Sequence, residues 1–188
     1  MGKVVVSQFV TVDGVFEDPG GSEDHERGGW AFQFDRGDDG NRFKLDEVMA
    51  AEALLLGRTT YEGFAAAWPS REGGFADKFN EMPKYVVSST LSDPEWNNST
   101  VVSGDLAAEV AKLKDQIEGV ILVNGSKQVV KALLEAELVD EYRLMVFPVV
   151  LGQGGRLFDE TEKPCALKLS DLKPVGPDGV IVLIYEPA

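Results

Sequence analysis

The sequence is poor in the residue types that build metal sites and nucleophilic catalytic centres. Its 188 residues include one cysteine, Cys165, and one histidine, His25. A single cysteine excludes an internal disulfide and a thiolate metal cluster. Zinc centres and Ser-His-Asp or Cys-His nucleophiles also need more of these residues than the chain has, unless His25 serves as the base. We therefore expect no metal site.

Basic residues are also few. Lys and Arg together number 18 against 32 Asp and Glu, which gives a formal net charge of −14 and a pI near 4.4. Nucleic-acid binding relies on clustered Lys and Arg that neutralise phosphates. The sequence has no such cluster, so we expect no nucleic-acid partner. A phosphorylated ligand would have to be held by helix N-termini and a few well-placed cations, because the overall field repels anions.

Long hydrophobic runs are absent. No apolar stretch approaches the roughly 20 residues that a membrane helix needs. Near the N-terminus, the apolar patch Val4-Val5-Val6 is soon interrupted by polar residues, so a secretory signal is not expected. The sequence therefore predicts a cytoplasmic protein without a membrane partner.

Several hydrolase and nucleotide motifs are missing as well. The sequence has no Gly-x-Ser-x-Gly elbow and no Gly-x-x-x-x-Gly-Lys-Ser/Thr phosphate loop. The run Gly152-Gln153-Gly154-Gly155 lacks the spacing of the dinucleotide fingerprint, and the first strand carries no such loop. With so little catalytic side-chain machinery, the sequence favours an enzyme in which a bound cofactor performs the reaction and the protein positions it.

What the sequence does have is buried strands that end in polar turns. Val120–Val123 has the composition of a buried strand and runs into Asn124-Gly125-Ser126, followed by an amphipathic helix with a 3.6-residue apolar period. We expect Ser126 to be the N-cap of this helix, with its hydroxyl accepting a hydrogen bond from the first turn. Such a helix N-terminus can bind phosphate, although many turns of this kind bind nothing.

Two other predicted strands end in similar turns. Ala53–Leu56 is followed by Gly57-Arg58-Thr59-Thr60, and Tyr85–Val87 is followed by Ser88-Ser89-Thr90. Glycine lets a backbone approach a phosphate, and Arg58 offers a fork of donors. An ordinary capped helix would use the same residues, but their recurrence in one chain favours a phosphate site.

The rest of the chain predicts one α/β domain covering residues 1–188. A strand opens it at Val4–Val10, and a long Gly- and Asp-rich loop runs from Glu17 to about Gly40. The aromatic residues of that loop predict either a loop that packs over a ligand or a small satellite core beneath it. Ala166–Leu169 and Val180–Tyr185 have no helix between them and predict an antiparallel pair.

A helix is predicted from Asn41 to Ala51, with Leu45, Val48 and Met49 as its apolar stripe. Asp46 then lies at the edge of this stripe, and Glu47 points away from it. A half-buried Asp46 would have the raised pKa that an acid near a substrate needs. A solvated flank charge is the alternative reading of the same residue.

Taken in order, five segments resemble the dihydrofolate reductase-like superfamily. They are Thr11–Gly14, Leu56–Glu62, Val87–Leu91, Val123–Ser126, and the stretch from Val139-Asp140-Glu141-Tyr142 to Pro148–Gly154. The resemblance covers nearly the whole chain and is greatest to the reductase domain of the bifunctional riboflavin-biosynthesis deaminase–reductase and its stand-alone relatives. It implies a three-layer α/β fold of dihydrofolate reductase-like type, with a mixed, mainly parallel sheet flanked by helices and a C-terminal antiparallel hairpin.

The resemblance also implies NADPH as the cofactor, bound across the strand ends. Its phosphates would be held by Gly57, Arg58, Thr59 and Thr60. The adenosine end and its 2′-phosphate would lie by Ser88, Ser89 and Thr90. The pyrophosphate would be received by Asn124, Gly125 and Ser126, with Lys127 nearby.

By the same resemblance, loop 14–40 lies where a mobile lid closes over nicotinamide and substrate. The implied substrate contacts are Trp30, Phe34, Leu151 and Gly152. The implied catalytic residues, which would orient the substrate, are Asp13 and Asp46. The superfamily's carboxylate on the first helix would fall near Asn41, so the sequence departs from that pattern.

The activity that the resemblance implies is NADPH-dependent reduction of a small heterocyclic substrate, similar to the 5-amino-6-(5-phosphoribosylamino)uracil reductase step of riboflavin biosynthesis. Two alternatives remain open. One is reduction of dihydrofolate or another pterin, and the other is a nucleotide-binding module without turnover. An apolar edge of the sheet, and relatives that pair through it, lead us to expect a homodimer.

Overall fold

A computed structural model describes residues 1–23, 25–158 and 160–188. The chain forms two compact units. The first consists of residues 1–6 and 45–140, and the second of residues 7–44 and 141–188. Strand β1 (Lys3–Thr11) and helix α1 (Gly37–Ala50) contribute residues to both units. No helix in the described ranges has the length and hydrophobicity that a membrane span requires.

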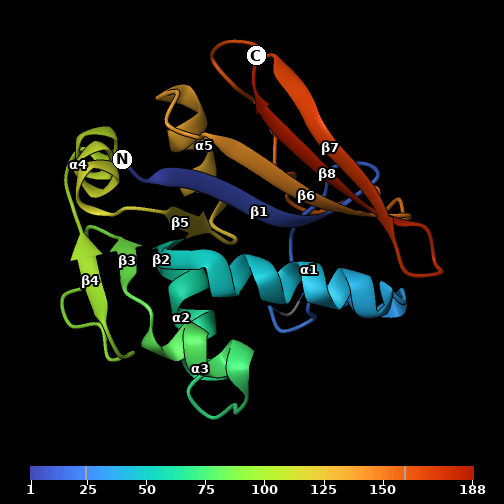
Figure 1. Cartoon of the computed structure of the whole chain (residues 1–188), viewed down its shortest axis with the longest axis horizontal. Coiled ribbons are helices and arrows are strands. Elements are labelled where there is room, and N and C mark those ends of the chain that lie inside the picture. Colours follow the sequence, from blue (N-terminus) through green and yellow to red (C-terminus); the bar gives the residue numbers. More distant parts are fainter. Residues whose placement is uncertain (24, 159) are drawn as a thin grey trace. The chain divides into compact units, whose positions relative to one another are not determined.

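The first unit is a parallel sheet with helices on both faces. Its strands lie in the order β4-β3-β2-β5-β1, and neighbouring strands are parallel. Besides β1 they are β2 (Ala51–Gly57), β3 (Lys84–Val87), β4 (Ser99–Val102) and β5 (Val120–Val123). Figure 1 shows helices α4 (Leu106–Gln116) and α5 (Lys127–Glu135) on one side of these strands, and α2 (Arg58–Ala67) and α3 (Gly74–Glu81) on the other.

The central strands of this unit are covered on both faces, which explains why their sequences are continuously apolar. Leu54, Leu55 and Leu56 have no exposed surface. Leu54 and Leu56 belong to a cluster that includes Tyr61 of α2 and Phe79 of α3. Leu55 points to the opposite face because side chains alternate along a strand. Burial of each leucine stabilises the fold by about 1.5–3 kcal/mol.

Helix α3 has no counterpart among the elements that the sequence predicts. It is short, and aromatic packing positions it. The rings of Phe75 and Phe79 lie 5.1 and 4.9 Å from the ring of Trp68, measured between centroids. Because short helices gain most of their stability from tertiary contacts, the local sequence alone gives little sign of this one.

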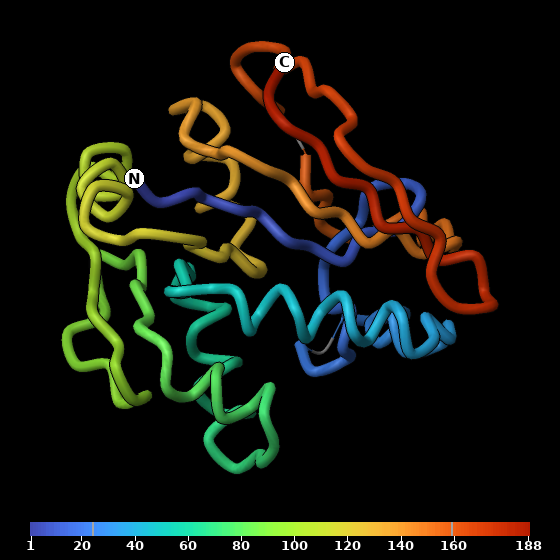
Figure 2. The backbone as a smooth tube through the Cα atoms, in the orientation of Figure 1, coloured from blue at the N-terminus to red at the C-terminus, as the bar shows by residue number. Residues whose placement is uncertain are grey.

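The second unit is built on antiparallel strands. After β1 come β6 (Glu141–Phe147), β8 (Val180–Pro187) and β7 (Leu167–Val175), and β8 is antiparallel to both of its neighbours. The long hairpin of β7 and β8 is easily traced in Figure 2. The predicted antiparallel pair is therefore confirmed, although both strands are longer than the sequence indicates. Among the described residues, eight strands form a mixed, mainly parallel sheet, as predicted.

Strand β7 is an edge strand and exposes apolar side chains. Leu169 and Leu172 are 45% and 49% exposed. This is the kind of apolar sheet edge that the sequence led us to expect. Assembly of two chains through it stays a prediction.

Helix α1 buries a different face from the one predicted. Glu47 and Val48 are 3% and 1% exposed, whereas Leu45 and Met49 are 39% and 51% exposed. Asp46 is exposed as well, so the predicted positions of Asp46 and Glu47 are reversed. Leu45 and Met49 are spaced by one helical turn and satisfy the periodicity on their own. The error arose because periodicity alone does not choose between two such faces.

Lys84, the first residue of β3, is a buried cation in the first unit. Its side chain has no exposed surface. The Nζ group donates hydrogen bonds to the backbone carbonyl oxygens of Asn80, Met82 and Asn97 at 2.8, 2.8 and 2.9 Å. It also lies 4.4 Å from the centre of the Trp96 ring. Burial lowers the pKa of Lys84 to about 8.

This lowered pKa predicts a pH dependence of stability. In the unfolded chain Lys84 keeps its ordinary pKa of 10.5. Between about pH 8 and about pH 10.5 the unfolded state therefore binds more protons than the folded state, so the contribution of Lys84 to the unfolding free energy rises with pH. In the variant Lys84→Met this contribution disappears. At neutral pH the variant also leaves three carbonyl groups without their donor, which costs about 1–3 kcal/mol.

Urea unfolding of both proteins over this pH range measures the effect. The two proteins differ only at residue 84, so the difference between wild type and variant isolates Lys84. We expect this difference in unfolding free energy to grow above about pH 8. A difference that is the same at neutral and alkaline pH would contradict the lowered pKa.

Candidate functional site

The three polar turns leave the parallel sheet of the first unit at one edge. Gly57 at the end of β2 is paired with Val87 at the end of β3, and Leu55 of β2 is paired with Val123 at the end of β5. Carboxyl ends of parallel strands therefore meet here, where open α/β sheets bind their ligands. We name the segments 57–60, 88–90 and 124–127 the three turns.

The turn after β5 is bonded directly to the turn after β2. The backbone N–H of Gly57 donates to the Ser126 hydroxyl at 2.6 Å, and this hydroxyl donates to Thr60 Oγ1 at 2.9 Å. Ser126 is the N-cap of α5, as predicted, but its side chain makes no bond to that helix. The predicted capping bond is wrong because Ser126 has left-handed backbone angles, with φ 64°, and its hydroxyl reaches α2 instead.

This close approach requires glycine at two positions. A Cβ atom at Gly125 would lie 2.7 Å from Thr60 Oγ1, and one at Gly57 would lie 3.0 Å from Ser126 Oγ. Gly125 also has a φ of 66°, which glycine adopts at little cost. The two glycines thus allow the turns after β2 and β5 to touch.

Arg58 connects the turn after β2 with the turn after β3. Its Nη1 donates to Thr90 Oγ1 at 2.5 Å, and its Nε donates to Glu62 Oε1 at 2.7 Å. The hydroxyl of Ser88 accepts from the backbone N–H groups of Thr90 and Leu91 at 3.2 and 3.0 Å, which shapes the turn. The Arg58 side chain is 47% exposed, so its ion pair adds little to stability. Hydrogen bonds thus join all three turns.

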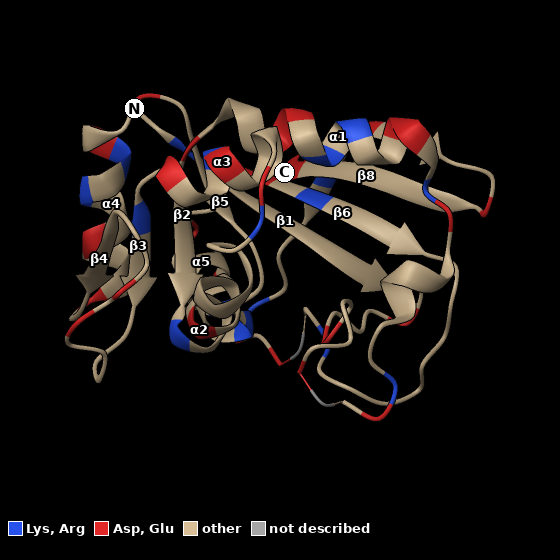
Figure 3. Cartoon of the chain, turned by 90° about the horizontal axis from the view of Figure 1, so that it is seen from below, with Lys and Arg blue, Asp and Glu red and all other residues tan. Residues whose placement is uncertain are grey.

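The three turns contain cations but no carboxylate, in a chain with a large surplus of acid. Arg58 and Lys127 are their charged residues. Figure 3 shows acidic residues spread over α1, α3 and α4, and a basic residue where β2 passes into α2. Two helices also begin here, and a helix N-terminus carries a partial positive charge. Local chemistry at this edge therefore suits an anion.

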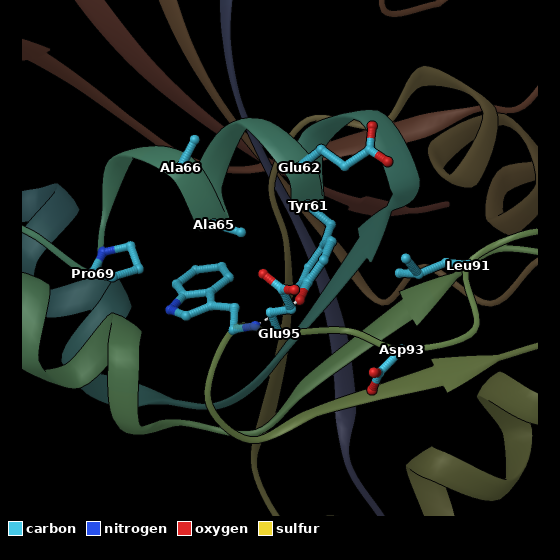
Figure 4. A pocket seen from close by; sticks show the side chains of 9 residues that line it. Tyr61, Glu62, Ala65, Ala66, Pro69, Leu91, Asp93 and Glu95 are labelled. Atoms are coloured by element: carbon cyan, nitrogen blue, oxygen red, sulfur yellow. Dashed lines mark hydrogen bonds between the residues drawn. The ribbon is translucent and has the colours of Figure 1, made fainter.

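A pocket of about 490 Å³ lies between α2 and the segment 91–96 (Figure 4). Its lining consists of Tyr61, Glu62, Ala65, Ala66, Pro69, Leu91, Asp93, Glu95 and Trp96. Three of these residues are carboxylates, which repel phosphate. This pocket is not foreseen from the sequence, because its lining comes from a helix and a loop that share no motif.

In the second unit, Asp13 anchors the glycine-rich segment after β6. Its carboxylate accepts hydrogen bonds from the Thr11 hydroxyl at 2.6 Å and from the backbone N–H groups of Leu151 and Gly152 at 3.2 and 2.8 Å. The bond from Thr11, with those from Gly152 and Leu151, holds the pKa of Asp13 below its ordinary value of 3.8. Asp13 is thus ionised at neutral pH and is not a proton donor.

Two of the expected substrate contacts are core residues of the second unit. Trp30 and Leu151 are 1% and 8% exposed. The Trp30 indole N–H donates to the carbonyl oxygen of Glu17 at 2.9 Å, and its ring meets Phe147 edge-on at 5.4 Å. Trp30 and Leu151 therefore pack in the core of this unit, and their expected contact with a substrate stays a prediction. The aromatic loop covers a satellite core, which was one of the two predicted possibilities.

Phe34 and Gly152 differ from these two. Phe34 is half-buried, with its ring 6.2 Å from that of Phe147, and Gly152 is exposed. Both remain accessible to a ligand. On α1, Asp46 is exposed, and Asn41 accepts a hydrogen bond from Arg36 Nε at 2.7 Å. The structure thus gives Asp46 no buried environment.

The first half of the predicted lid makes several hydrogen bonds within the second unit. Glu17 Oε2 accepts from the Gly155 N–H at 2.6 Å, and the Leu157 N–H donates to the Gly14 carbonyl oxygen at 3.0 Å. Asp18, only 2% exposed, accepts from the N–H groups of Ser22, Glu23 and His25 at 2.7, 3.1 and 3.3 Å. This part of the loop is therefore held by hydrogen bonds in the structure, and its mobility stays a prediction.

The RibD C-terminal domain family matches residues 2–181 of the chain. The chain belongs to that family. The RibD-type chain is 26% identical to Bacillus subtilis (strain 168) YyaP, a protein of uncharacterised function, and the match covers 97% of this chain and 94% of YyaP.

Solved structures show how widely this fold is shared. The putative riboflavin biosynthesis protein of Shewanella sp. PV-4 is 22% identical, with a TM-score of 0.75 and 99% of each chain covered. Dihydrofolate reductase from Enterococcus faecalis, complexed with NADP(H), is 18% identical, with a TM-score of 0.64, 98% of this chain and 96% of that chain covered. The dihydrofolate reductase-like fold predicted from the sequence is thus confirmed.

A bifunctional enzyme has the same fold in part of its chain. The Thermotoga maritima diaminohydroxyphosphoribosylaminopyrimidine deaminase/5-amino-6-(5-phosphoribosylamino)uracil reductase is 13% identical, with a TM-score of 0.66. The match covers all of the RibD-type chain and 57% of the Thermotoga chain. The RibD-type chain thus spans little more than half of that protein.

The anchoring role of Asp13 predicts the behaviour of Asp13→Asn. The amide keeps the size of the carboxylate but loses its charge and one acceptor oxygen. We expect a lower Tm at neutral pH and faster amide exchange at Gly152 by NMR. Because folding lowers the pKa of Asp13, its stabilisation is present above the ordinary pKa of 3.8 and is lost as pH falls through the folded-state value. The Tm difference between wild type and variant therefore shrinks in strong acid.

Glu186→Gln is a matched control, because Glu186 is an exposed acid on β8 of the same unit. It should leave both Tm and the exchange rate of Gly152 unchanged. Equal exchange at Gly152 in wild type and Asp13→Asn would remove Asp13 from the anchoring role.

Proposed function

We propose that this RibD-type protein is an NADPH-dependent reductase of a small heterocyclic substrate. The observation that carries the proposal is the hydrogen-bonded meeting of the three turns at the carboxyl ends of parallel strands. Family membership supports a reductase, and the Enterococcus faecalis protein of the same fold is complexed with NADP(H). The charge of the turns supports an anionic group of the cofactor at this edge.

The backbone of the first turn of α2 fits a phosphate group. The first N–H groups of a helix have no acceptor inside it. Within the described residues, no loop carbonyl or side chain accepts from the N–H groups of Arg58 or Thr59. A Cβ atom at Gly57 would meet the side chains of Ser126 and Val129, so glycine at this position lets α5 pack against the start of α2. In our proposal the segments 57–60 and 124–127 hold the phosphates that join the two halves of NADPH.

Arg58 is proposed to select NADPH over NADH. Thr90 and Ser88 fix the turn beside it, and its guanidinium is held by Thr90 on one side and Glu62 on the other. A guanidinium matches the geometry of a phosphate with paired donors. In our proposal Arg58, with the hydroxyl groups of Ser88, Ser89 and Thr90, binds the 2′-phosphate that distinguishes NADPH.

When bound, the cofactor supplies a hydride through its nicotinamide ring. The protein then has to bind the cofactor, orient the substrate and keep water away. Phe34 and Gly152 are the proposed substrate contacts that remain accessible. Asp13 is proposed to act indirectly, by fixing the backbone at Gly152. We assign no proton donor.

A ribosylaminopyrimidine of riboflavin biosynthesis is the substrate that we propose. The Thermotoga maritima protein named as a 5-amino-6-(5-phosphoribosylamino)uracil reductase has the same fold, and the Shewanella protein is named for riboflavin biosynthesis. Reduction of a pterin is less well supported. The resemblance would place a carboxylate near Asn41, and this residue is an exposed amide bonded to Arg36.

Binding and turnover are tested separately. Thermal-shift titrations with NADPH and NADH come first, because a ligand that binds only the folded state raises Tm with its concentration. Oxidation of NADPH is then followed with the ribosylaminopyrimidine and with dihydrofolate. Stabilisation by NADPH together with oxidation in the presence of the ribosylaminopyrimidine supports the proposal. Stabilisation without oxidation of either candidate would favour a nucleotide-binding module, and no stabilisation by either nucleotide would refute cofactor binding.

Arg58→Ala tests the proposed selection. Loss of a charge-assisted contact costs about 1.5–3 kcal/mol, so Kd for NADPH should rise by about tenfold to about a hundredfold. Kd for NADH, which lacks the 2′-phosphate, should change much less. Fluorescence titration measures both.

Arg71→Ala is the matched control, because Arg71 is an exposed arginine that stacks on Trp68 beyond the opposite end of α2. It should leave the preference between the nucleotides unchanged. An equal loss for NADPH and NADH in Arg58→Ala would remove Arg58 from the 2′-phosphate role.

A further inference from the structure

Ser126 is the N-cap residue of α5, but its hydroxyl bonds to the start of α2. An N-cap serine normally has extended backbone angles and accepts a hydrogen bond from the first turn of its own helix. Ser126 instead has φ 64° and ψ 67°, and no side-chain bond to α5. Its hydroxyl lies 2.6 Å from the Gly57 nitrogen and 2.9 Å from Thr60 Oγ1, both at the start of α2.

This arrangement is costly for a residue that has a side chain. Left-handed backbone angles are unfavourable for residues other than glycine, and α5 forgoes a side-chain cap. Glycine would relieve the backbone cost and is already present next door, at Gly125 with φ 66°. An observed strain of this kind points to a function for the residue that bears it. What serine has and glycine lacks is the hydroxyl.

The hydroxyl forms a bridge between two helix starts. It accepts from the N-cap residue of α2, Gly57, and donates to Thr60 in the first turn of the same helix. It therefore satisfies the Gly57 N–H with a neutral oxygen, while the next N–H groups, of Arg58 and Thr59, are left for a ligand. A shift of α5 relative to α2 would break both bonds.

We propose that Ser126 is a positioning residue, whose hydroxyl fixes the starts of α2 and α5 at the separation that lets both helices bind the same phosphorylated ligand. This role rests on the proposed function, and it revises the part that the resemblance implies for Ser126. The hydroxyl holds the protein's two helix ends together instead of contacting the phosphate itself. Strain at Ser126 is the cost of that bridge.

The test separates affinity from stability with two substitutions at one position. Ser126→Gly removes the hydroxyl and the backbone strain together. Ser126→Ala removes the hydroxyl and keeps the strain. We expect Kd for NADPH, measured by fluorescence titration, to rise by about tenfold in both variants, since the bridge is worth about one hydrogen bond. Tm without ligand should be about 2–4 °C higher in Ser126→Gly than in Ser126→Ala.

Glu137→Gly is the matched control for the backbone effect. Glu137 lies just beyond the opposite end of α5, is exposed and has a φ of 57°. Replacement by glycine should raise Tm, because it relieves a similar strain, without changing Kd for NADPH. This control shows how relief of left-handed strain changes Tm and Kd for NADPH when no bridging hydroxyl is lost.

The outcomes distinguish this role from the reductase proposal. Weaker NADPH binding in Ser126→Gly, at a Tm no lower than that of wild type, supports the positioning role, since a purely structural serine would not separate the two measurements. Wild-type affinity in Ser126→Gly would overturn the role and leave the reductase proposal intact. If the affinity for NADPH falls only in Ser126→Ala, and Tm falls with it, the positioning role is also overturned. Absence of binding of NADPH and NADH by the wild-type protein would overturn both.

Discussion

A hydrogen bond between the Gly57 N–H and the Ser126 hydroxyl holds together the part of the fold on which the proposed function depends. The strands that lead to it are buried on both faces, so their carboxyl ends are fixed relative to one another. The two glycines remove the side chains that would keep the turns apart. Arg58 extends the same set of contacts to Thr90. Sheet, glycines and hydroxyl together bring three turns that contain two cations and no carboxylate to one edge of the sheet in a strongly acidic protein.

Several carboxylates in this chain accept hydrogen bonds from its own backbone. In the second unit, Asp13 accepts from Leu151 and Gly152, and Asp18 accepts from three N–H groups of its loop. At the start of α4, Asp105 accepts from the Ala107 N–H at 3.1 Å. Carboxylates used in this way accept hydrogen bonds from backbone N–H groups that have no partner in a helix or strand. The surplus of negative charge is therefore partly structural, and it does not exclude an anionic ligand at the three turns, whose own residues include no carboxylate.

The sequence was sufficient for the features that depend on local chemistry. Continuous apolar runs such as Ala53–Leu56 identified the buried strands, and the residues after them identified the three turns. The resemblance supplied the fold, which the comparisons with solved structures confirmed. The turns after β2 and β5 touch because these strands are parallel neighbours in the sheet. The apolar pattern of a single strand does not reveal which strands are neighbours.

Other features depend on packing that the sequence does not display. Helix α1 carries apolar residues on two faces, so Glu47 was placed outside and Leu45 inside. Trp30 was assigned to a ligand because an aromatic residue in a polar loop has the same local signature whether it contacts a ligand or a core. The direction of the Ser126 hydroxyl depends on left-handed backbone angles that serine rarely adopts. The only sequence sign of them was the glycine that precedes it.

Amide hydrogen exchange with and without NADPH tests the central claim most directly, because it reports on each segment separately. If the three turns form one cofactor site, NADPH slows amide exchange in segments 57–60, 88–90 and 124–127. Exchange in the acidic segment 93–96, which contributes to the pocket beside α2, stays unchanged. Unchanged exchange in the three turns, or protection confined to segment 93–96, would contradict the account.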